Sequence, residues 1–236
     1  MSIKAIILAA GKGSRLGNLT KETPKCLLEI PEKKIKIIDW QIKFLRKNKI
    51  KDILVVTGFE SNKIRSYLKN KVRYKYFANY NNSNNLMTMH SIKEEFNESF
   101  ICIFSDLIFE EKILKLLIKK KGDIIPVIDK TKSMPGTMRI KTYTKKLKDI
   151  GSHIPASKGD GNFIGMCKFS KKGSLLLKKE LEKINENNKD YYTLAIKNLI
   201  KKKVFIDFLD ISDLFWQEID DVNDYKKLKT NIKLLK

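Results

Sequence analysis

Strands and helices alternate along the first 130 residues of the chain, and this alternation constrains the fold more than any other feature. Residues 3–10 form an apolar run, interrupted only by Lys4, that ends in glycine-rich sequence, which is typical of a strand buried in a parallel sheet. Further strands are predicted at 53–57, 73–77, 100–104 and 124–128, with helices between them. Because successive parallel strands need crossover helices, this order predicts an α/β fold with a Rossmann-like, mostly parallel sheet.

Helix caps and glycines mark where the predicted elements begin and end. Asp39 and Ser61 are expected to cap the first two helices, and a polar loop at 81–85 precedes a third helix that runs to about residue 96. After residue 130 the less regular pattern predicts a hairpin over 137–142 and 145–151, strands at 162–169 and 204–210, and helices at about 171–185, 190–200 and 221–235. We interpret this second half as an insertion that covers one edge of the sheet.

The chain of 236 residues carries 49 Lys and Arg against 27 Asp and Glu, a formal net charge of +22. Nearly all of the positive charge is lysine, which is spread over the whole length with short clusters at 119–121 and 201–203. A nucleic-acid-binding surface would gather its basic residues in one stripe with aromatic residues between them. We therefore expect no nucleic-acid partner, and a basic chain suits small anionic substrates.

The length and the apolar content predict one domain over residues 1–236 with a packed core, since 42% of the residues are hydrophobic. Three cysteines without a C-x-x-C pair do not form a disulfide framework, which favours a reducing, cytoplasmic location. The apolar run before Gly11 is too short for a signal peptide or a membrane span, so we expect no membrane insertion.

The segment 8–16, LAAGKGSRL, places a glycine-rich turn directly after the first buried strand. Ligands bind at this carboxyl edge in open α/β folds, and glycines let backbone N–H groups approach a phosphate. Arg15 adds a fixed fork for phosphate oxygens. Leu16 stands where a P-loop or a dinucleotide fingerprint would need its last glycine, so both of those motifs are excluded.

The pattern LAAGxG[ST]RL, followed by Thr20 and by Pro24-Lys25, resembles the nucleotidyltransferases that activate sugar 1-phosphates and phosphoalcohols. It is most similar to the short choline-phosphate cytidylyltransferases, although Asn18 stands where members of the family often have proline. The resemblance covers the whole chain. It implies the nucleotide-diphospho-sugar transferase type of fold, with a nucleotide-binding half over 1–130 and an acceptor-binding half over 131–236.

The resemblance also implies a reaction and its catalytic residues. An acceptor phosphate or phosphonate oxygen, already ionised near neutral pH, attacks the α-phosphorus of a nucleoside triphosphate, and pyrophosphate leaves without the need for a general base. Lys25 would contact the α-phosphate and Arg15 the leaving pyrophosphate. Mg²⁺ would be held by Asp106, at the end of the fourth strand, and by Asp220 in the late Glu-Ile-Asp element. The alternatives are a surface salt bridge for Arg15, a solvated surface lysine for Lys25 and a helix cap for each of the two aspartates.

The same resemblance assigns the nucleotide contacts. The nucleotide would lie against the first strand and the turn that follows it, at Leu8, Ala9, Ala10, Gly11, Gly13 and Ser14. Asn84 and Asn85 offer donors and acceptors that suit the edge of a pyrimidine, and they would begin a helix whose N–H groups face the ligand. A polar turn that only caps this helix is the alternative.

The acceptor side is expected to combine aromatic and acidic side chains. Phe163, Tyr191, Tyr192 and Trp216 could surround a quaternary ammonium by cation–π contact, and Asp160, Asp190 and Glu218 could supply the counter-charge. Ordinary core packing is the alternative for each aromatic residue. In the segment 160–166, Asn162 replaces an acid that is common in the family.

The leading functional prediction is Mg²⁺-dependent cytidylyl transfer from CTP to phosphocholine or a related small phosphate or phosphonate. A sugar 1-phosphate nucleotidyltransferase is the alternative within the same class. A catalytically inactive nucleotide-binding protein and a basic nucleic-acid-binding protein are alternatives of another class. The identity of the base, the acceptor and the oligomeric state, including a homodimer, stay open at this point.

Overall fold

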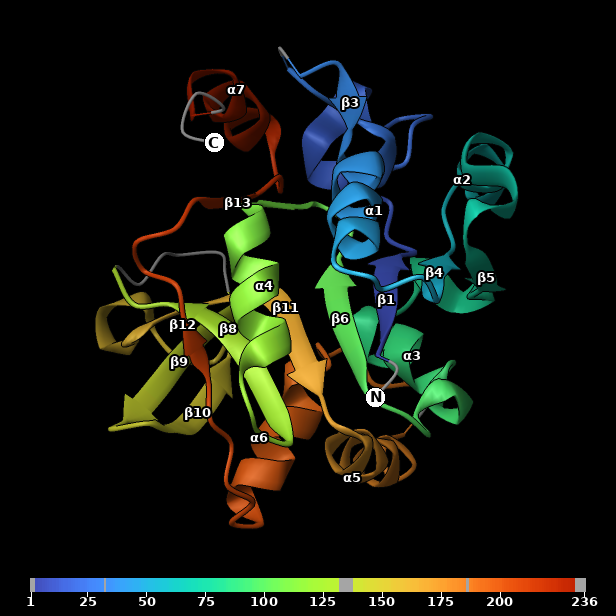
Figure 1. Cartoon of the computed structure of the whole chain (residues 1–236). Helices are drawn as coiled ribbons and strands as arrows, with labels where there is room; N and C mark the ends of the chain where they lie inside the picture. The colour runs from blue at the N-terminus through green and yellow to red at the C-terminus, as the bar shows by residue number, and fades with distance from the viewer. Residues whose placement is uncertain (1–2, 32, 132–137, 186, 232–236) are drawn as a thin grey trace.

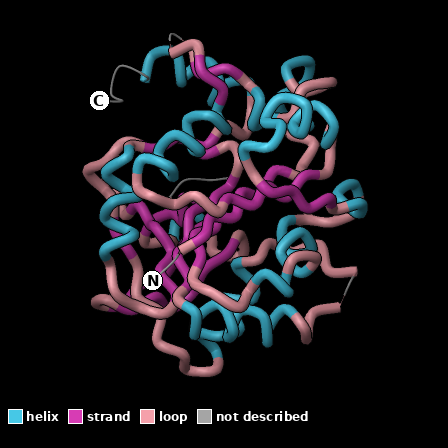
Figure 2. The backbone as a smooth tube through the Cα atoms, turned by 45° about the vertical axis from the view of Figure 1, so that its right-hand side comes forward, coloured by secondary structure: helices cyan, strands magenta, loops and turns pink. Residues whose placement is uncertain are grey.

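A computed structural model of the chain describes residues 3–31, 33–131, 138–185 and 187–231. A nine-stranded sheet lies between two layers of helices (Figures 1 and 2). The strands are β1 (Lys4–Ala9), β2 (Glu29–Ile30), β3 (Ile35–Lys36), β4 (Ile53–Thr57), β5 (Arg73–Tyr76), β6 (Phe100–Phe104), β7 (Leu107–Phe109), β8 (Ile124–Asp129), β9 (Met138–Tyr143), β10 (Lys146–Gly151), β11 (Gly161–Phe169), β12 (Leu209–Asp210) and β13 (Trp216–Glu218). The helices are α1 (Ile37–Lys47), α2 (Ser61–Leu68), α3 (Asn85–His90), α4 (Glu111–Lys119), α5 (Lys171–Leu181), α6 (Thr193–Lys201) and α7 (Val222–Asn231).

The N-terminal part of the sheet is parallel, as the alternation of strands and helices predicts. Strands β6, β1, β4 and β5 lie side by side in this order, and Ala5 of β1 pairs with Ile53 on one side and with Ile101 on the other. Every residue of β1 is buried, and all but the first are apolar; the buried Lys4 forms an ion pair with Glu95 at 3.1 Å. The predicted α/β class with a Rossmann-like sheet is confirmed.

The strands of the second half extend this same sheet. Strand β11 pairs antiparallel with β6 and also with β8 and β9, and β10 completes the hairpin with β9. In the sheet, β11 therefore lies between β6 and β8. The alternation of strands and helices had suggested that β8 would lie directly beside β6. The hairpin is confirmed over its described residues, while residue 137 lies outside them.

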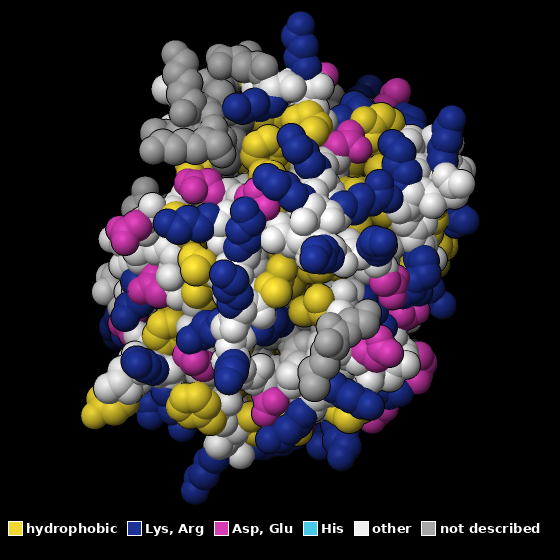
Figure 3. Space-filling model, in the orientation of Figure 1, with side chains coloured by type: hydrophobic (Ala, Val, Ile, Leu, Met, Phe, Trp, Pro, Cys, Tyr) yellow, Lys and Arg dark blue, Asp and Glu magenta, His cyan; other side chains and the backbone are white. Residues whose placement is uncertain are grey.

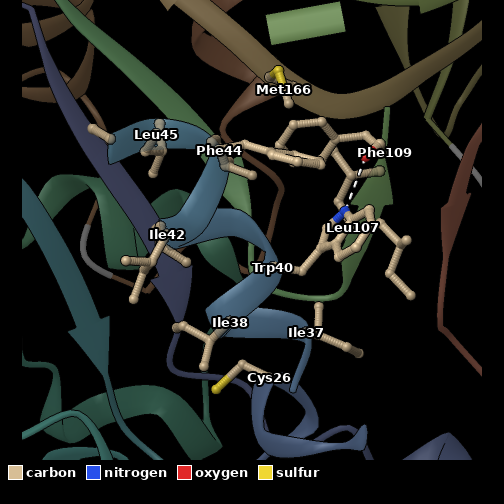
Figure 4. Close-up of a cluster of buried hydrophobic side chains, with 14 of the residues drawn as sticks. Cys26, Ile37, Ile38, Trp40, Ile42, Phe44, Leu45, Leu107, Phe109 and Met166 are labelled. Atoms are coloured by element: carbon tan, nitrogen blue, oxygen red, sulfur yellow. Dashed lines mark hydrogen bonds between the residues drawn. The ribbon is translucent and has the colours of Figure 1, made fainter. Parts of the chain in front are cut away.

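Two hydrophobic clusters fill the space between the sheet and its helices. One cluster lies under α1, α2, α4 and α7 and takes Ile7 from β1, and the other lies under α3, α5 and α6 and takes Leu8. Successive residues of β1 thus point to opposite faces of the sheet. Figure 4 shows part of the first cluster, where Trp40 and Phe44 of α1 lie beside Phe109 and Met166.

Several predicted boundaries and caps need correction. Helix α1 begins at Ile37, so Asp39 lies in its first turn, and Ser61 is the first residue of α2 instead of its cap. Helix α3 ends at His90, and only residues 209–210 of the strand predicted at 204–210 pair with a neighbour. Asp221 accepts a hydrogen bond from the N–H of Asp224 in the first turn of α7, at 2.9 Å. None of the described helices combines the length and the apolar character needed to cross a bilayer.

Candidate active site

A cavity of about 280 Å³ opens at the carboxyl ends of β1 and β6, the edge of an α/β sheet where ligands bind. Strand β1 contributes Leu8 and the following Ala10, and β6 contributes Phe104 and the following Ser105 and Asp106. The remaining lining residues are Gly11, Gly13, Ser14, Arg15, Lys25, Tyr80, Ser83, Asn84, Asn85, Thr88, Met138, Phe163, Tyr191, Glu218 and Asp220.

The glycine-rich turn packs closely against Lys25. Gly13 has a φ of 66°, and a Cβ atom at this position would lie 3.2 Å from Cε of Lys25. The hydroxyl of Thr20 donates a hydrogen bond of 2.8 Å to the carbonyl oxygen of Gly13 and so closes the turn. Glycine is therefore needed at position 13 both for its backbone conformation and for the passage of the lysine side chain.

Lys25 lies between two carboxylates at the floor of the cavity. Its Nζ donates hydrogen bonds to Oδ2 of Asp106 at 2.7 Å and to Oδ1 of Asp220 at 3.1 Å. The guanidinium of Arg15 donates to the same Oδ1 of Asp220 at 2.9 Å, and its side chain is 60% exposed at the cavity mouth. The structure thus brings together four of the residues that the sequence predicts to be catalytic or metal-binding.

The charges of this network shift the pKa values of two side chains. Burial alone would lower the pKa of Lys25, but the charges and hydrogen bonds of Asp106 and Asp220 raise it above its usual value, so the amine stays protonated. Burial raises the pKa of Glu218 well above its usual range, and repulsion by the same two aspartates adds to this effect. Lys25 and Arg15 oppose the shift at Glu218 only in part.

Two short strands that carry no recognisable sequence pattern join the two halves of this site. Strands β7 and β13 pair antiparallel, with Leu107 opposite Glu218, and the N–H of Ile219 donates to the carbonyl oxygen of Asp106 at 3.1 Å. This pairing places Asp220 beside Asp106 although 114 positions separate them (220 minus 106).

Helix α1 holds the turn that carries Asp106. The buried amide of Gln41 donates two hydrogen bonds of 2.8 Å, one to the carbonyl of Phe104 and one to that of Leu107, so it connects both ends of the turn. The indole of Trp40 donates to the carbonyl of Phe109 at 3.0 Å in the same strand (Figure 4). These contacts link the position of Asp106 to the hydrophobic cluster under α1.

The asparagines predicted at the nucleotide side line the cavity and also have structural partners. The Oδ1 of Asn84 accepts a hydrogen bond from the N–H of Asn85 at 3.0 Å at the start of α3. The Oδ1 of Asn85 accepts a hydrogen bond from the N–H of Tyr192 at 2.8 Å and so connects α3 to the start of α6. The side chain of Ala9 packs in the cluster under α1, and Ala9 is absent from the cavity lining.

Of the side chains predicted at the acceptor side, Phe163, Tyr191 and Glu218 line the cavity. Phe163 is almost fully buried, and Phe104 packs edge-on against it with ring centroids 6.0 Å apart. Tyr191 lies just before α6, and Glu218, in β13, lies close to the charges of Asp106 and Asp220. They give this end of the cavity aromatic surfaces and a carboxyl group.

The structure does not place the other predicted acceptor contacts at the cavity. Tyr192 is completely buried and packs edge-on against Phe104 and Phe163, so it supports two lining rings from behind. The indole of Trp216 donates to the carboxylate of Asp129 at 2.8 Å, away from the cavity. Asp160 and Asp190 are also absent from the lining. The carboxylate of Asp160 accepts hydrogen bonds from the N–H and the hydroxyl of Thr142, and Asp190 lies in the segment that precedes α6.

Six lining residues were not identified from the sequence, namely Tyr80, Ser83, Thr88, Phe104, Ser105 and Met138. Ser105 and Phe104 directly precede Asp106, and Thr88 lies one helical turn after Asn84 and Asn85, so chain proximity could have indicated these three. Tyr80 and Ser83 flank or belong to the asparagine loop. Met138 follows a segment of irregular sequence and carries no such signal.

Asp106 and Asp220 are the residues that could hold a divalent cation. The Oδ1 of Asp106 is buried and has no hydrogen-bond partner, as expected for a carboxylate oxygen that coordinates a cation. Within the described ranges no cluster of three or more His, Cys, Asp or Glu side chains forms a metal site on its own. A pair of carboxylates completed by phosphate oxygens and water is the arrangement that suits Mg²⁺.

Comparison with known proteins identifies the class to which this site belongs. The family model for nucleotidyl transferases matches residues 4–145 of the chain, which is more than half of its length. The chain therefore belongs to the nucleotidyl transferase family, and its sheet and helices have the nucleotide-diphospho-sugar transferase fold.

Two relatives match nearly the whole chain. The CTP:phosphoglutamine cytidylyltransferase of Campylobacter jejuni is 28% identical over 94% of this chain and 97% of its own length. The choline-phosphate cytidylyltransferase of Streptococcus pneumoniae is 28% identical over 98% of this chain and 99% of its own length.

Solved structures agree with these relatives. The structure of CTP:phosphocholine cytidylyltransferase from Streptococcus pneumoniae matches with a TM-score of 0.79 at 25% identity, over 98% of this chain and all of that chain. The inositol-1-phosphate CTP transferase of T. maritima also has a TM-score of 0.79, but at 18% identity this likeness concerns the fold alone.

Proposed function

We propose that the protein transfers a cytidylyl group from CTP to phosphocholine or another small phosphate or phosphonate, with the aid of Mg²⁺ and with release of pyrophosphate. The observation that carries the proposal is the network at the cavity floor, where Lys25 contacts Asp106 and Asp220 and Arg15 contacts Asp220. The choice of CTP rests on the relatives, which use CTP and a phosphorylated acceptor.

The reaction needs positioning and charge neutralisation more than proton transfer. An ionised oxygen of the acceptor forms a bond to the α-phosphorus while the bond from this phosphorus to the bridging oxygen of pyrophosphate breaks. Lys25 stays protonated in its carboxylate environment, so it can neutralise charge on the α-phosphate and the acceptor oxygen. Arg15 lies at the exposed mouth, where a triphosphate would enter and pyrophosphate would leave.

Asp106 and Asp220 would hold the Mg²⁺ ion, and the unpartnered Oδ1 of Asp106 supports this assignment. When bound, the ion supplies positive charge to the phosphate oxygens. Lys25 occupies the space between the two carboxylates, so it keeps their repulsion small before the substrates bind. The turn with Gly11, Gly13 and Ser14 would then offer backbone N–H groups to the phosphates.

An acceptor that carries an ammonium group suits the part of the cavity lined by Phe163, Tyr191 and Glu218. Phe163 and Tyr191 present aromatic surfaces there, and Glu218 presents a carboxyl group. Cation–π contact with such rings is worth about 0.5–2 kcal/mol. The cage would be smaller than the sequence suggests, because Tyr192 and Trp216 lie outside the lining.

Release of pyrophosphate, measured with and without Mg²⁺, tests the proposal. CTP is combined with phosphocholine, 2-aminoethylphosphonate or glucose 1-phosphate, and each of the other triphosphates replaces CTP in parallel. We expect release only with CTP and an ammonium-bearing acceptor. Release with the sugar phosphate alone would favour the sugar 1-phosphate alternative, and release with none of these pairs would contradict the proposed substrates.

Variants test the role of the network itself. Asp106→Asn should abolish turnover and leave the fold intact, whereas Asp52→Asn, at an exposed aspartate that pairs with Arg73, should leave turnover unchanged. Full activity of the Asp106→Asn protein would contradict the metal assignment.

A further inference from the structure

A second hollow lies at the opposite end of the sheet from the active site. It has a volume of about 870 Å³ and is bordered by Ile3 and Ser99, which directly precede β1 and β6, and by Phe169 at the end of the antiparallel β11. Apolar side chains form much of its wall, including Ile118, Leu176 and Val204. The active-site cavity and this hollow therefore open at the two opposite edges of the same strands.

The fold brings the two lysine clusters of the sequence to this end. Residues 119–121, at the end of α4, line the hollow, and residues 201–203 directly precede Val204 and Phe205, which also line it. The two segments are joined by an ion pair of 2.7 Å between Lys120, after α4, and Asp207, after α6. Elsewhere on the face seen in Figure 3, basic side chains are widely spread and acidic ones lie between them.

Four of these lysines are exposed and have no carboxylate partner among the described residues, namely Lys119, Lys121, Lys201 and Lys203. The neighbouring Lys120 pairs with Asp207 at 2.7 Å, and Lys202 pairs with Glu180. The four unpaired lysines, referred to below as the lysine edge, therefore keep their charge available for a partner.

The turn after α4 is held in place by a buried lysine. Lys168 is 8% exposed, and its ammonium donates hydrogen bonds to the carbonyls of Ile118 and Lys120. These carbonyls belong to the last turn of α4, whose backbone oxygens otherwise lack partners. Residues 119–121 are thus a fixed part of the fold.

An exposed aromatic residue completes this surface. Phe205 is 60% exposed although it lies next to the buried Ile206, and it borders the hollow. The ring of Phe205 continues the apolar wall of the hollow at the surface, next to the unpaired lysines, so apolar surface and positive charge occur together at this end.

We infer that this end of the molecule docks onto an anionic membrane surface, with the lysine edge at the lipid headgroups and Phe205 in the interface. Positive charge meets negative headgroups, and an apolar hollow suits the boundary between headgroups and acyl chains. None of the described lining residues is arginine, which makes a nucleic-acid partner the weaker fit. Docking at this edge leaves the active-site cavity open to water, and the inference does not depend on which nucleotide is used.

Co-sedimentation with vesicles tests this inference. The protein is mixed with vesicles of phosphatidylcholine that contain one third phosphatidylglycerol, at low and at high salt, and with pure phosphatidylcholine vesicles. We expect binding only to the anionic vesicles, and weaker binding at high salt. Lys201→Gln combined with Lys203→Gln should weaken binding roughly thirtyfold, about fivefold for each lysine, and Phe205→Ser should weaken it roughly tenfold.

Matched changes at other sites serve as controls. Lys226 and Lys227 are exposed on α7, at the other end of the molecule in Figure 1, and Tyr143 is 67% exposed at the end of β9. Lys226→Gln with Lys227→Gln, and Tyr143→Ser, should bind vesicles as the unchanged protein does. Thermal unfolding, which can be measured without any substrate, checks that each variant is folded.

Three results would overturn the inference. They are an absence of binding to anionic vesicles, an equal loss in the control variants, and equal binding to uncharged vesicles. If a short fluorescent RNA binds through the lysine edge while vesicles do not bind, the partner of this surface is a nucleic acid and not a membrane. Each readout is independent of CTP turnover, so a failure of the proposed activity and a failure of this docking are separate results.

Discussion

Gln41 should be a positioning residue for the active site although its side chain does not line the cavity. Its amide nitrogen donates hydrogen bonds to the carbonyls of Phe104 and Leu107, which flank Asp106 on both sides. Replacement by leucine keeps a similar volume but removes both donors. The turn that carries Asp106 would then lose its connection to α1.

The size of the effect follows from these two bonds. Each net hydrogen bond contributes about 1 kcal/mol, and a carbonyl that stays buried without a partner costs somewhat more. The Oε1 atom of Gln41 is itself buried without a partner, and its removal offsets part of this loss. We expect Gln41→Leu to lower the free energy of unfolding by about 2 kcal/mol, which corresponds to roughly 4–8 °C in Tm for a chain of this size.

Urea unfolding and pyrophosphate release measure the two consequences separately. At a temperature where the variant is fully folded, kcat should fall about tenfold or more while KM for the triphosphate changes little, because Asp106 shifts relative to Lys25. Trp40→Phe removes one buried hydrogen bond to Phe109 in the same strand and should destabilise the protein with a smaller effect on kcat. Normal turnover in a destabilised Gln41→Leu protein would refute the positioning role, and unchanged stability would refute the hydrogen-bond argument.

Three further predictions concern charge and packing. Lys25→Met should reduce turnover about 100-fold or more in the pyrophosphate assay, since it removes a cation from the reacting phosphate; near-normal turnover would exclude that role. Gly165→Ala should lower the free energy of unfolding by roughly 2–4 kcal/mol in urea, because φ is +79° and the new Cβ would lie 2.6 Å from Cδ2 of Phe104; an unchanged midpoint would contradict this. Hydrogen bonds from Arg73 hold the pKa of Glu95 at about 2, below its usual 4.5, so its stabilisation is complete above pH 4.5 and is lost as the pH falls toward 2. Glu95→Gln should flatten this dependence by about 1 kcal/mol after allowance for solvent exposure, and an equal slope in both proteins would refute it.

The elements closest to the active site could be predicted because their signals are local. The apolar run at β1 and the glycine-rich turn with Arg15 lie within a dozen residues, and the structure places both at the cavity. Strands β7 and β13 could not be predicted in this way, since three residues are too few to show a period of two. Their pairing nevertheless determines which carboxylates meet.

The aromatic residues show a second limit of local reasoning. Phe163 and Tyr192 were both predicted at the acceptor side, yet one lines the cavity and the other packs behind it. Trp216 turns to Asp129 instead of the acceptor side. A buried ring and a ligand-binding ring need the same residue types, so only the packing of neighbouring elements separates the two roles.

The sequence by itself determined the alternation of the main strands and helices in the first half, the chemistry of the phosphate turn and the identity of the charged residues that the family resemblance selects. These properties depend on backbone preferences and on apolar periodicity, which act over a few residues. The tertiary structure alone decided that Arg15 and Asp220, which are 205 positions apart, share a salt bridge, and that residues 119–121 line the same hollow as Val204 and Phe205, which follow the second lysine cluster. Such contacts depend on how the sheet is ordered and covered, and a local pattern carries no information about that order.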